Sequence, residues 1–200
     1  MNDITTAPCV KFICEAMAEI ALLADYPETI PTLARWFRAQ WPEYYAERNP
    51  AEIAQDFYED TNRDSLPVRL VAFAGGELAG TITLRAHAIW TLPEYHPGLG
   101  GLLVVERHRS RGIGTELVSA GMNLARELGY ERVYATTVNA RGILERLGWM
   151  FVRAVSHDDE QLLLYCVELE EHGLTPHSDE PAKKIIAPRN FSRPSPGAKP

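Results

Sequence analysis

Residues 101–117 read GLLVVERHRSRGIGTEL, and this stretch is the most informative part of the chain. The apolar residues 102–105 form a short continuous run, which predicts a strand buried on both faces. Beyond the turn, Ile113, Leu117, Leu124 and Leu128 fall on one face of a helical pattern. A strand, a glycine-containing turn and a helix N-terminus are therefore expected in direct succession.

The turn has the composition of a phosphate-binding loop. Gly112 and Gly114 carry no side chain, so their amides can approach phosphate oxygens, and the helix N-terminus adds partial positive charge. Arg109 and Arg111 supply full charges. The alternative is a basic, solvated turn whose glycines only relieve backbone strain. No Lys-Ser or Lys-Thr follows the glycines, which excludes a P-loop, and the three-glycine dinucleotide fingerprint is missing.

At these residues the chain resembles the GNAT superfamily of acyl-CoA-dependent N-acyltransferases. Residues 102–114 match the family's strand followed by Arg/Gln-x-x-Gly-x-Gly/Ala, and residues 144–149, LERLGW, resemble its Tyr-Glu-Lys-Leu-Gly-Phe segment. The resemblance covers about residues 19–169. It implies an α/β fold with a mixed, mostly antiparallel central sheet and flanking helices.

The resemblance also implies acetyl-CoA as cosubstrate and a set of residues that bind it. The backbone of Leu102, Leu103 and Val104 would pair with the pantetheine arm, in an opening between this strand and the strand at 132–137. Asn139 would face the cofactor, although it could equally cap the helix that follows. The residues expected around the pyrophosphate are Arg109, Ser110, Arg111, Gly112, Ile113, Gly114 and Thr115.

The remaining elements are predicted from the spacing of apolar residues and from the residues that cap, end or turn an element. A helix is expected over 31–41, ended by Pro42, and a second one is capped by Asn49 with Pro50 in its first turn. Gly75-Gly76 between two strand-like runs predicts a hairpin. The two strand-like runs that flank this turn are 68–73 and 78–86. Further strands are expected at 19–24 and at 132–137, and two more before residue 169. A helix is expected over 140–147.

Composition limits the class of protein. The chain has 200 residues, 46% of them hydrophobic, which is enough for one core. The predicted organisation is an N-terminal extension over 1–18, one domain over 19–169 and a Pro-rich, disordered tail over 170–200. The net charge of −7 argues against a nucleic-acid partner and suits a cationic acceptor only weakly.

Three cysteines without close pairing indicate neither a disulfide framework nor a metal site, so a reducing compartment is expected. No leader or membrane segment is recognisable in the sequence. These observations predict a cytoplasmic protein with no membrane partner.

The candidate catalytic residues are a general base and the position at which the family has a general acid. Many family members place a tyrosine, the general acid, where this chain has Leu144. His96 is the candidate general base because histidine is a common general base at physiological pH, with Glu94 and Glu106 as alternatives, although His96 could also be an ordinary loop residue. Four aromatic residues either border the acceptor site or pack in the core: Trp36, Trp41, Tyr44 and Tyr45.

The sequence thus predicts an N-acetyltransferase that moves an acetyl group from acetyl-CoA to a primary amine by direct attack. The acceptor is a small-molecule or peptide amine, which the sequence does not identify. A non-catalytic acyl-CoA-binding regulatory module is the alternative, motivated by Leu144. The resemblance allows a homodimer, but no residue pattern requires one.

Overall fold

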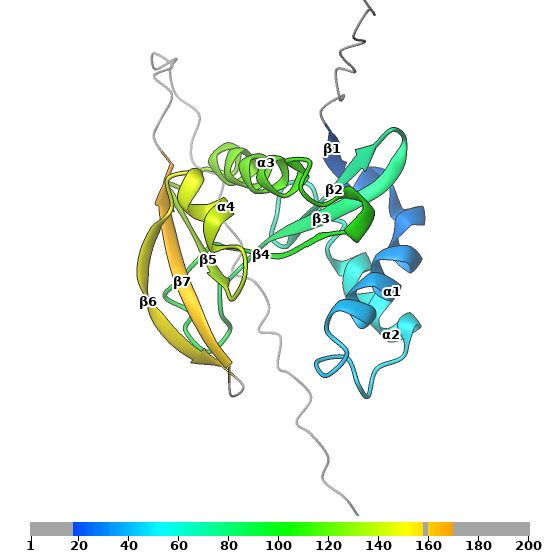
Figure 1. Ribbon diagram of the computed structural model, residues 1–200, viewed down its shortest axis with the longest axis horizontal. Helices are drawn as coiled ribbons and strands as arrows, with labels where there is room; N and C mark the ends of the chain where they lie inside the picture. The colour runs from blue at the N-terminus through cyan, green and yellow to red at the C-terminus, as the bar shows by residue number, and fades with distance from the viewer. Residues whose placement is uncertain (1–17, 158–159, 170–200) are drawn as a thin grey trace, which may run out of the picture.

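The protein is built around one seven-stranded sheet with helices on both faces. The computed structural model describes residues 18–157 and 160–169. The strand order is β1-β2-β3-β4-β5-β7-β6, and every neighbouring pair is antiparallel except β4 and β5. In Figure 1, α1 and α2 lie at one end of the molecule, β6 and β7 at the other, and α3 crosses the middle. The predicted α/β fold class is confirmed.

The elements follow the predicted order closely. The strand bounds are β1 (Glu19–Leu22), β2 (Val68–Ala74), β3 (Glu77–Arg85), β4 (Gly98–Val104), β5 (Arg132–Thr137), β6 (Met150–His157) and β7 (Glu160–Glu168). The α-helices are α1 (Ile30–Gln40), α2 (Pro50–Glu59), α3 (Ile113–Glu127) and α4 (Arg141–Arg146), with short 3-10 turns η1 (Leu23–Asp25), η2 (Pro27–Thr29) and η3 (Glu106–His108).

Local signals explain where several elements begin and end. The Asn49 side chain accepts hydrogen bonds from the first turn of α2, while the Glu52 side chain accepts from the Asn49 amide, which completes a capping box. Gly75 and Gly76 both have positive φ, as a two-residue hairpin turn requires. The first strand ends at Leu22, two residues earlier than predicted, because the chain turns there to bury Leu23 completely.

Apolar side chains fill both sides of the sheet. One cluster joins α3 and α4 to the sheet through residues such as Leu117, Val118 and Leu144, and a second joins α1 and α2 to it through Phe37, Phe57 and others. A third small cluster packs the loop between β3 and β4 against β6 and β7. The sheet is therefore covered where the helices and this loop lie.

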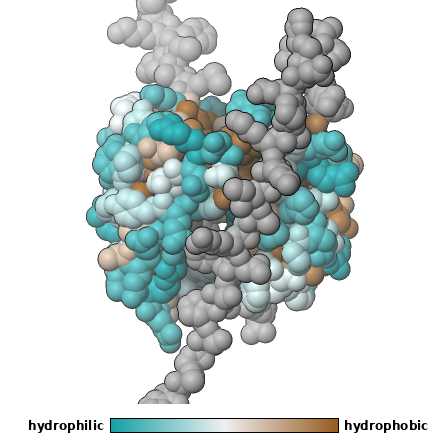
Figure 2. All heavy atoms as spheres, turned by 180° about the vertical axis from the view of Figure 1, so that it is seen from behind, coloured by the Kyte–Doolittle hydropathy of each residue, from teal (hydrophilic) through white to brown (hydrophobic). Residues whose placement is uncertain are grey.

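The surface away from these clusters is mixed in character. Figure 2 shows the face behind that of Figure 1, on which hydrophilic residues predominate and hydrophobic ones lie in small groups between them. Within the described residues, no helix is both long and apolar enough to cross a membrane. The predicted N-terminal extension, apart from its last residue, and the predicted tail lie outside the described residues.

The sheet opens between β4 and β5. These parallel strands pair only at Gly98 with Tyr134 and at Leu99 with Ala135, and beyond that point they have no common ladder. On its other side β4 carries a bulge, because its register with β3 shifts between Thr81 and Thr83. The predicted separation of the two strands is confirmed, and it leaves the backbone of β4 after Leu99 without a partner on β5.

Candidate active site

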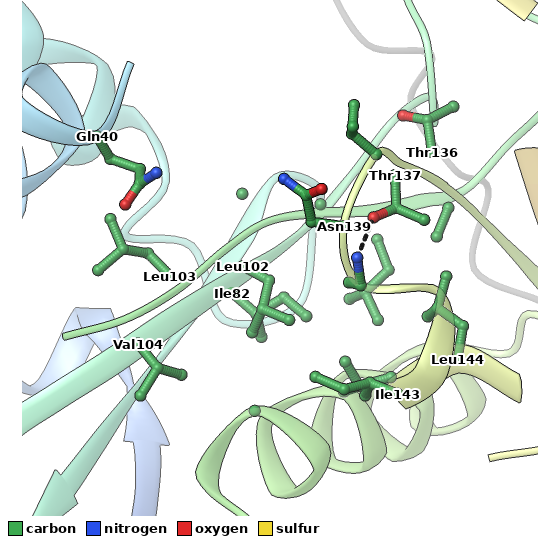
Figure 3. Close-up of a pocket in the computed structure, with 18 of the residues that line it drawn as sticks. Gln40, Ile82, Leu102, Leu103, Val104, Thr136, Thr137, Asn139, Ile143 and Leu144 are labelled. Atoms are coloured by element: carbon green, nitrogen blue, oxygen red, sulfur yellow. Dashed lines mark hydrogen bonds between the residues drawn. The ribbon is translucent and has the colours of Figure 1, made fainter. Parts of the chain in front are cut away.

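A groove of about 790 Å³ occupies the opening between β4 and β5. Gln40 at the end of α1 borders one side, and Thr136, Thr137 and Asn139 border the other, with β4 running between them (Figure 3). Ile143 and Leu144 of α4 also line it. One end of the groove therefore meets the turn before α3, and the other reaches the glycines of β4.

The turn before α3 is shaped as an anion cradle. Ser110 and Gly112 have φ values of 61° and 87°, so the backbone makes two left-handed steps before the helix begins at Ile113. Left-handed steps of this kind turn successive amides toward one concave side, which is how backbone nests bind anions. At Gly112 only glycine adopts such a conformation without strain.

Arg109 does not project freely from this turn. Its Nε donates to the Val104 carbonyl at 2.9 Å, and its Nη2 donates to the Gln40 side-chain oxygen at 3.3 Å. The guanidinium thus ties the end of β4 to the end of α1. It places a positive charge beside the groove while it holds the wall in position.

Most of the predicted cofactor residues meet in the groove. Arg111, Gly112 and Thr115 belong to the same turn and first helical residues but do not line the groove itself. The predicted residues that do line it are Leu102, Leu103, Val104, Arg109, Ser110, Ile113, Gly114 and Asn139.

Asn139 does not cap the following helix. The residue at the N-cap of α4 is Ala140, whose amide donates to the Thr137 hydroxyl at 2.7 Å, and no side chain caps the helix. Of the two interpretations open from the sequence, the structure therefore excludes the cap. Asn139 instead presents its side chain on the wall of the groove.

The model of the family described as "Acetyltransferase (GNAT) family" matches residues 30–149. The chain belongs to the GNAT acetyltransferase family. Acetyl-CoA as the predicted cosubstrate agrees with this membership. No protein with a curated function matches the chain.

Solved structures of GNAT proteins share the fold at low sequence identity. An aminoglycoside 6′-N-acetyltransferase complexed with coenzyme A is 19% identical, with a TM-score of 0.61 over 80% of this chain and 99% of that one. The enzyme of this name from Enterococcus faecium is 19% identical, with a TM-score of 0.59 over 80% and 99% of the two chains. The putative acetyltransferase yncA from Salmonella typhimurium with its cofactor acetyl-CoA is 13% identical, with a TM-score of 0.60 over 80% and 98%.

Leu144 is the main departure from the GNAT pattern. Its side chain is 3% exposed and belongs to the main core cluster, as the apolar stripe of the helix predicts. The residue also lines the groove, so an aliphatic side chain stands where many members of the family have a phenol. The position cannot donate a proton.

His96 is not brought into the groove. It precedes β4, at the end where β4 and β5 still pair, and it lines a separate pocket with Glu94, Tyr130 and Tyr134. Glu106, the other alternative, lies in η3 beside the phosphate turn. The role of His96 as base therefore stays a prediction, and its separate pocket counts against it.

The structure adds a carboxylate that sequence reasoning missed. Glu160, the first residue of β7, lines the groove and is exposed. It is the one carboxylate among the described residues of the lining. Nothing in its local sequence marks it, because its position depends on the pairing of β7 with both β5 and β6.

The four aromatic candidates divide between the core and the surface. Trp36 and Tyr45 pack against the cluster under α1 and α2. Trp41 lines the groove and is 36% exposed, while Tyr44 is 64% exposed. Within the described residues, no group of His, Cys, Asp or Glu could hold a metal ion.

Proposed function

We propose that this chain transfers the acetyl group of acetyl-CoA to a primary amine by direct attack. The observation that carries the proposal is the opening between β4 and β5, where unpaired strand backbone leads to a left-handed turn at the start of α3. This combination suits a cosubstrate with an amide-bearing arm and a pyrophosphate. Acetyl-CoA supplies an activated thioester.

The residues of the groove divide the binding between backbone and side chains. Strand backbone at Leu102 to Val104 can pair with the amides of the pantetheine arm, since no strand of the described chain competes for it on that side. The turn from Arg109 to Gly112 meets the pyrophosphate with amides and positive charge. Ile143 and Leu144 provide an apolar wall beside the arm.

The bulge in β4 supports the chemical step. Gly101 has a φ of 61°, and between the paired residues at 100 and 103 two residues of β4 face a single residue of β3. A bulge frees an amide from the ladder, and an amide held rigidly beside the thioester carbonyl stabilises the negative charge that develops on its oxygen. This contribution needs no particular side chain.

The transfer forms a C–N bond and breaks the thioester C–S bond. Glu160 is the side chain in the groove that can take the proton of the attacking amine, directly or through water. The sulfur leaves as a thiolate and is protonated by solvent, because Leu144 has no proton to give. With a thiol pKa of about 8.5, taking cysteine as a guide, a thiolate leaves without a general acid.

The proposal is tested by following thiol release from acetyl-CoA with a panel of amines and identifying the acetylated amine by mass spectrometry. Steady, amine-dependent release with a product of matching mass is the expected result. Tight binding of acetyl-CoA without turnover across the panel would contradict acetyl transfer.

A further inference from the structure

Two arginines lie on one face of the sheet next to the acyl end of the groove. Arg69 of β2 pairs with Thr83 of β3, two residues from Arg85, so all three side chains project to the same face. On β4 the arginines meet consecutive glycines. A Cβ built on Gly100 would lie 2.7 Å from Nη2 of Arg85, and one built on Gly101 would lie 3.7 Å from Nη1 of Arg69.

Those two glycines also line the groove. The guanidinium groups therefore stand directly behind the bulge at which the thioester is expected. A Cβ on Gly100 would clash with Arg85, whereas one on Gly101 would meet the Phe37 ring at 3.6 Å as well as Arg69 at 3.7 Å. We call Arg69 and Arg85 the arginine pair.

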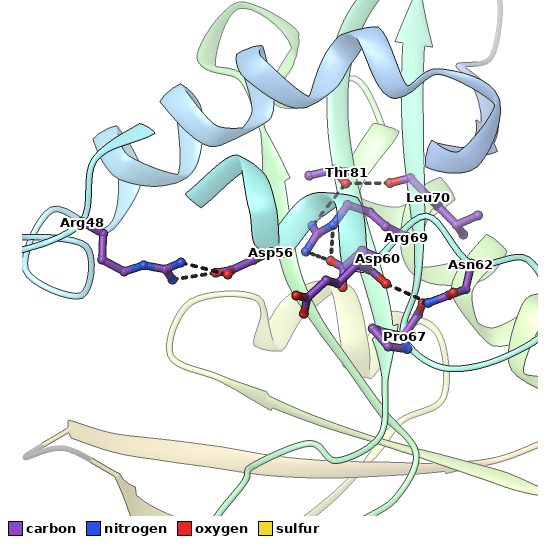
Figure 4. A network of polar contacts seen from close by, with 9 residues as sticks. Arg48, Asp56, Asp60, Asn62, Pro67, Arg69, Leu70 and Thr81 are labelled. Carbon is purple, nitrogen blue, oxygen red and sulfur yellow. Dashed lines mark hydrogen bonds and ion pairs between the residues drawn. The ribbon is translucent and has the colours of Figure 1, made fainter. Parts of the chain in front are cut away.

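Arg69 is fully engaged within the protein. Its Nη2 and Nε lie 2.6 and 2.7 Å from Oδ2 of Asp60, and its guanidinium carbon lies 4.3 Å from the ring centre of Phe57 and 5.1 Å from that of Phe37. Figure 4 shows this buried pair and its extension to Thr81. Arg69 acts as a fixed positive charge that Asp60 neutralises.

Arg85 has no such counter-ion. Its hydrogen bond in the described part of the chain goes to the Ala88 carbonyl at 2.7 Å, and no described carboxylate pairs with it. Burial, opposed by the charge of Tyr44 and reinforced by that of Arg69, lowers the pKa of Arg85. The arginine pair and Asp60 together carry two positive charges and one negative charge.

Two buried polar atoms at the same place lack partners. Oγ1 of Thr83 and Nε of Arg85 are enclosed, and neither has a hydrogen-bond partner among the described residues. Thr83 is 4% exposed and pairs with Gly100, the residue against which the Arg85 guanidinium lies. Buried donors without partners cost free energy, so a group that hydrogen-bonds to both of them would be stabilised there.

Both groups can donate hydrogen bonds, and the uncompensated charge is positive. We propose that the acceptor is an amine that also carries a carboxylate, such as a free amino acid, and that Arg85 and Thr83 bind this carboxylate. The inference rests on the proposed function and specifies its acceptor. An arginine can form two parallel hydrogen bonds with a carboxylate, and the Arg85 guanidinium lies against Gly100, which lines the groove.

The same charge disfavours a polycationic acceptor. Placing several ammonium groups beside an unpaired guanidinium is repulsive, and the repulsion is strong where water is excluded. The acceptor site of this chain is therefore unlike one built to hold an aminoglycoside, the substrate named for two of the structural neighbours.

The test compares matched amines that differ only in the carboxylate: an amino acid, its amide, and the corresponding decarboxylated amine. We expect kcat/KM of the native protein to favour the amino acid by about tenfold or more. Arg85→Gln should abolish this preference through KM and leave the rate with the two carboxylate-free amines within about twofold. Arg132→Gln, an exposed arginine paired with Glu168, is the control and should keep the preference.

Thr83→Val is the second variant, because it removes the unpaired hydroxyl and keeps the shape. We expect the melting temperature to stay the same or rise, while KM for the amino acid increases severalfold. An equal response of the native protein to all three amines, or an Arg85→Gln variant that keeps the preference, would overturn the proposal.

A further arm separates failure of this inference from failure of the proposed function. If no amine supports thiol release, titration calorimetry with amino acids in the presence of coenzyme A still reports the carboxylate site. Binding that Arg85→Gln abolishes would support the site and reject acetyl transfer, whereas no binding would reject both. Peptides that begin with Asp or Glu test whether the bound carboxylate belongs to a peptide side chain instead of a free amino acid. If the protein acetylates such peptides and not amino acids, the proposal of a free amino acid as acceptor is overturned.

Discussion

The guanidinium of Arg85 fills the space that a side chain on Gly100 would need. A Cβ at this position would approach Nη2 to 2.7 Å and Cζ to 2.8 Å, closer than non-bonded atoms allow. Because Gly100 lines the groove and Arg85 lies behind it, the glycine gives the guanidinium its place beside the acyl end of the site.

Gly100→Ala should therefore displace Arg85 while the fold survives, since the clash involves the end of a flexible side chain. We expect KM for amino-acid acceptors to rise about tenfold, with kcat for amines that lack the carboxylate changed by less than twofold. Steady-state kinetics with matched amines measures this. Equal losses for amines with and without the carboxylate would show that the added methyl group blocks the site and does not act through Arg85.

Removing one partner of the ion pair between Asp60 and Arg69 should be costly because both side chains are buried, with exposures of 14% and 8%. Asp60→Asn leaves the Arg69 charge uncompensated, and we expect a loss of about 3 kcal/mol in the free energy of unfolding. Urea denaturation measures the loss.

Asp56→Asn is a matched control in α2, the helix that ends directly before Asp60. Its pair with Arg48, also visible in Figure 4, is much more exposed, at 53% and 36%. Exposed pairs contribute about 0–1 kcal/mol. Similar losses in the two variants would contradict the view that burial makes the difference.

Deprotonation of Tyr45 should lower the free energy of unfolding in strong alkali. Burial, with the charge of Tyr44 as a smaller cause, raises the pKa of Tyr45 from 10.0 to about 12. The folded state therefore holds its proton more tightly than the unfolded state, so the contribution is present below pH 10 and is lost as the pH rises through about 12.

Tyr45→Phe removes this titration, and its melting temperature should fall less between pH 9 and pH 12 than that of the native protein. Tyr58→Phe, at a tyrosine that is 50% exposed, is the control. An unchanged pH dependence in Tyr45→Phe would rule out the contribution.

Glu160 and His96 are two candidates for the general base, and they line different pockets. Glu160 lines the groove, and His96 lines a different pocket. We expect Glu160→Gln to lower kcat/KM by about 100-fold, the scale of general-base catalysis, and His96→Gln to lower it by less than threefold. The dependence of kcat/KM on pH should change only in Glu160→Gln. A larger loss in His96→Gln would restore the histidine as base.

The sequence predicted the parts of the fold that have local signals. The capping box at Asn49, the hairpin at Gly75-Gly76 and the strand and helix around the phosphate turn are each encoded within a few residues, and the structure contains all of them. The apolar spacing of residues in α4 likewise explains why Leu144 packs in the core. These features depend on propensity and periodicity, which a single sequence carries.

The acceptor side of the groove was not predictable, because its residues come together only through contacts between distant parts of the chain. Arg69, Arg85 and Gly100 are brought together by the register of three strands, and no short motif marks any of them. Glu160 reaches the groove only because β7 lies between β5 and β6. His96 was selected for its chemistry, but the paired end of the two strands places it in another pocket.

The central claim is that the turn before α3 binds the pyrophosphate of acetyl-CoA, and two glycines allow a matched test of it. Gly112 and Gly129 have nearly equal left-handed φ values of 87° and 83°; a Cβ at Gly129 would meet nothing within 4 Å, and one at Gly112 would meet only Oε1 of Glu116, at 3.8 Å. Glutamate at each position should therefore cost similar stability, but only the one at position 112 adds negative charge at the turn.

The measurement is the melting temperature of the native protein, Gly112→Glu and Gly129→Glu with and without acetyl-CoA at one hundred times the dissociation constant of the native protein. Saturation at this level stabilises a protein by about 2.7 kcal/mol, or several degrees. We expect the native protein and Gly129→Glu to show this shift and Gly112→Glu to show little of it. No shift in the native protein, or equal shifts in both variants, would contradict the account.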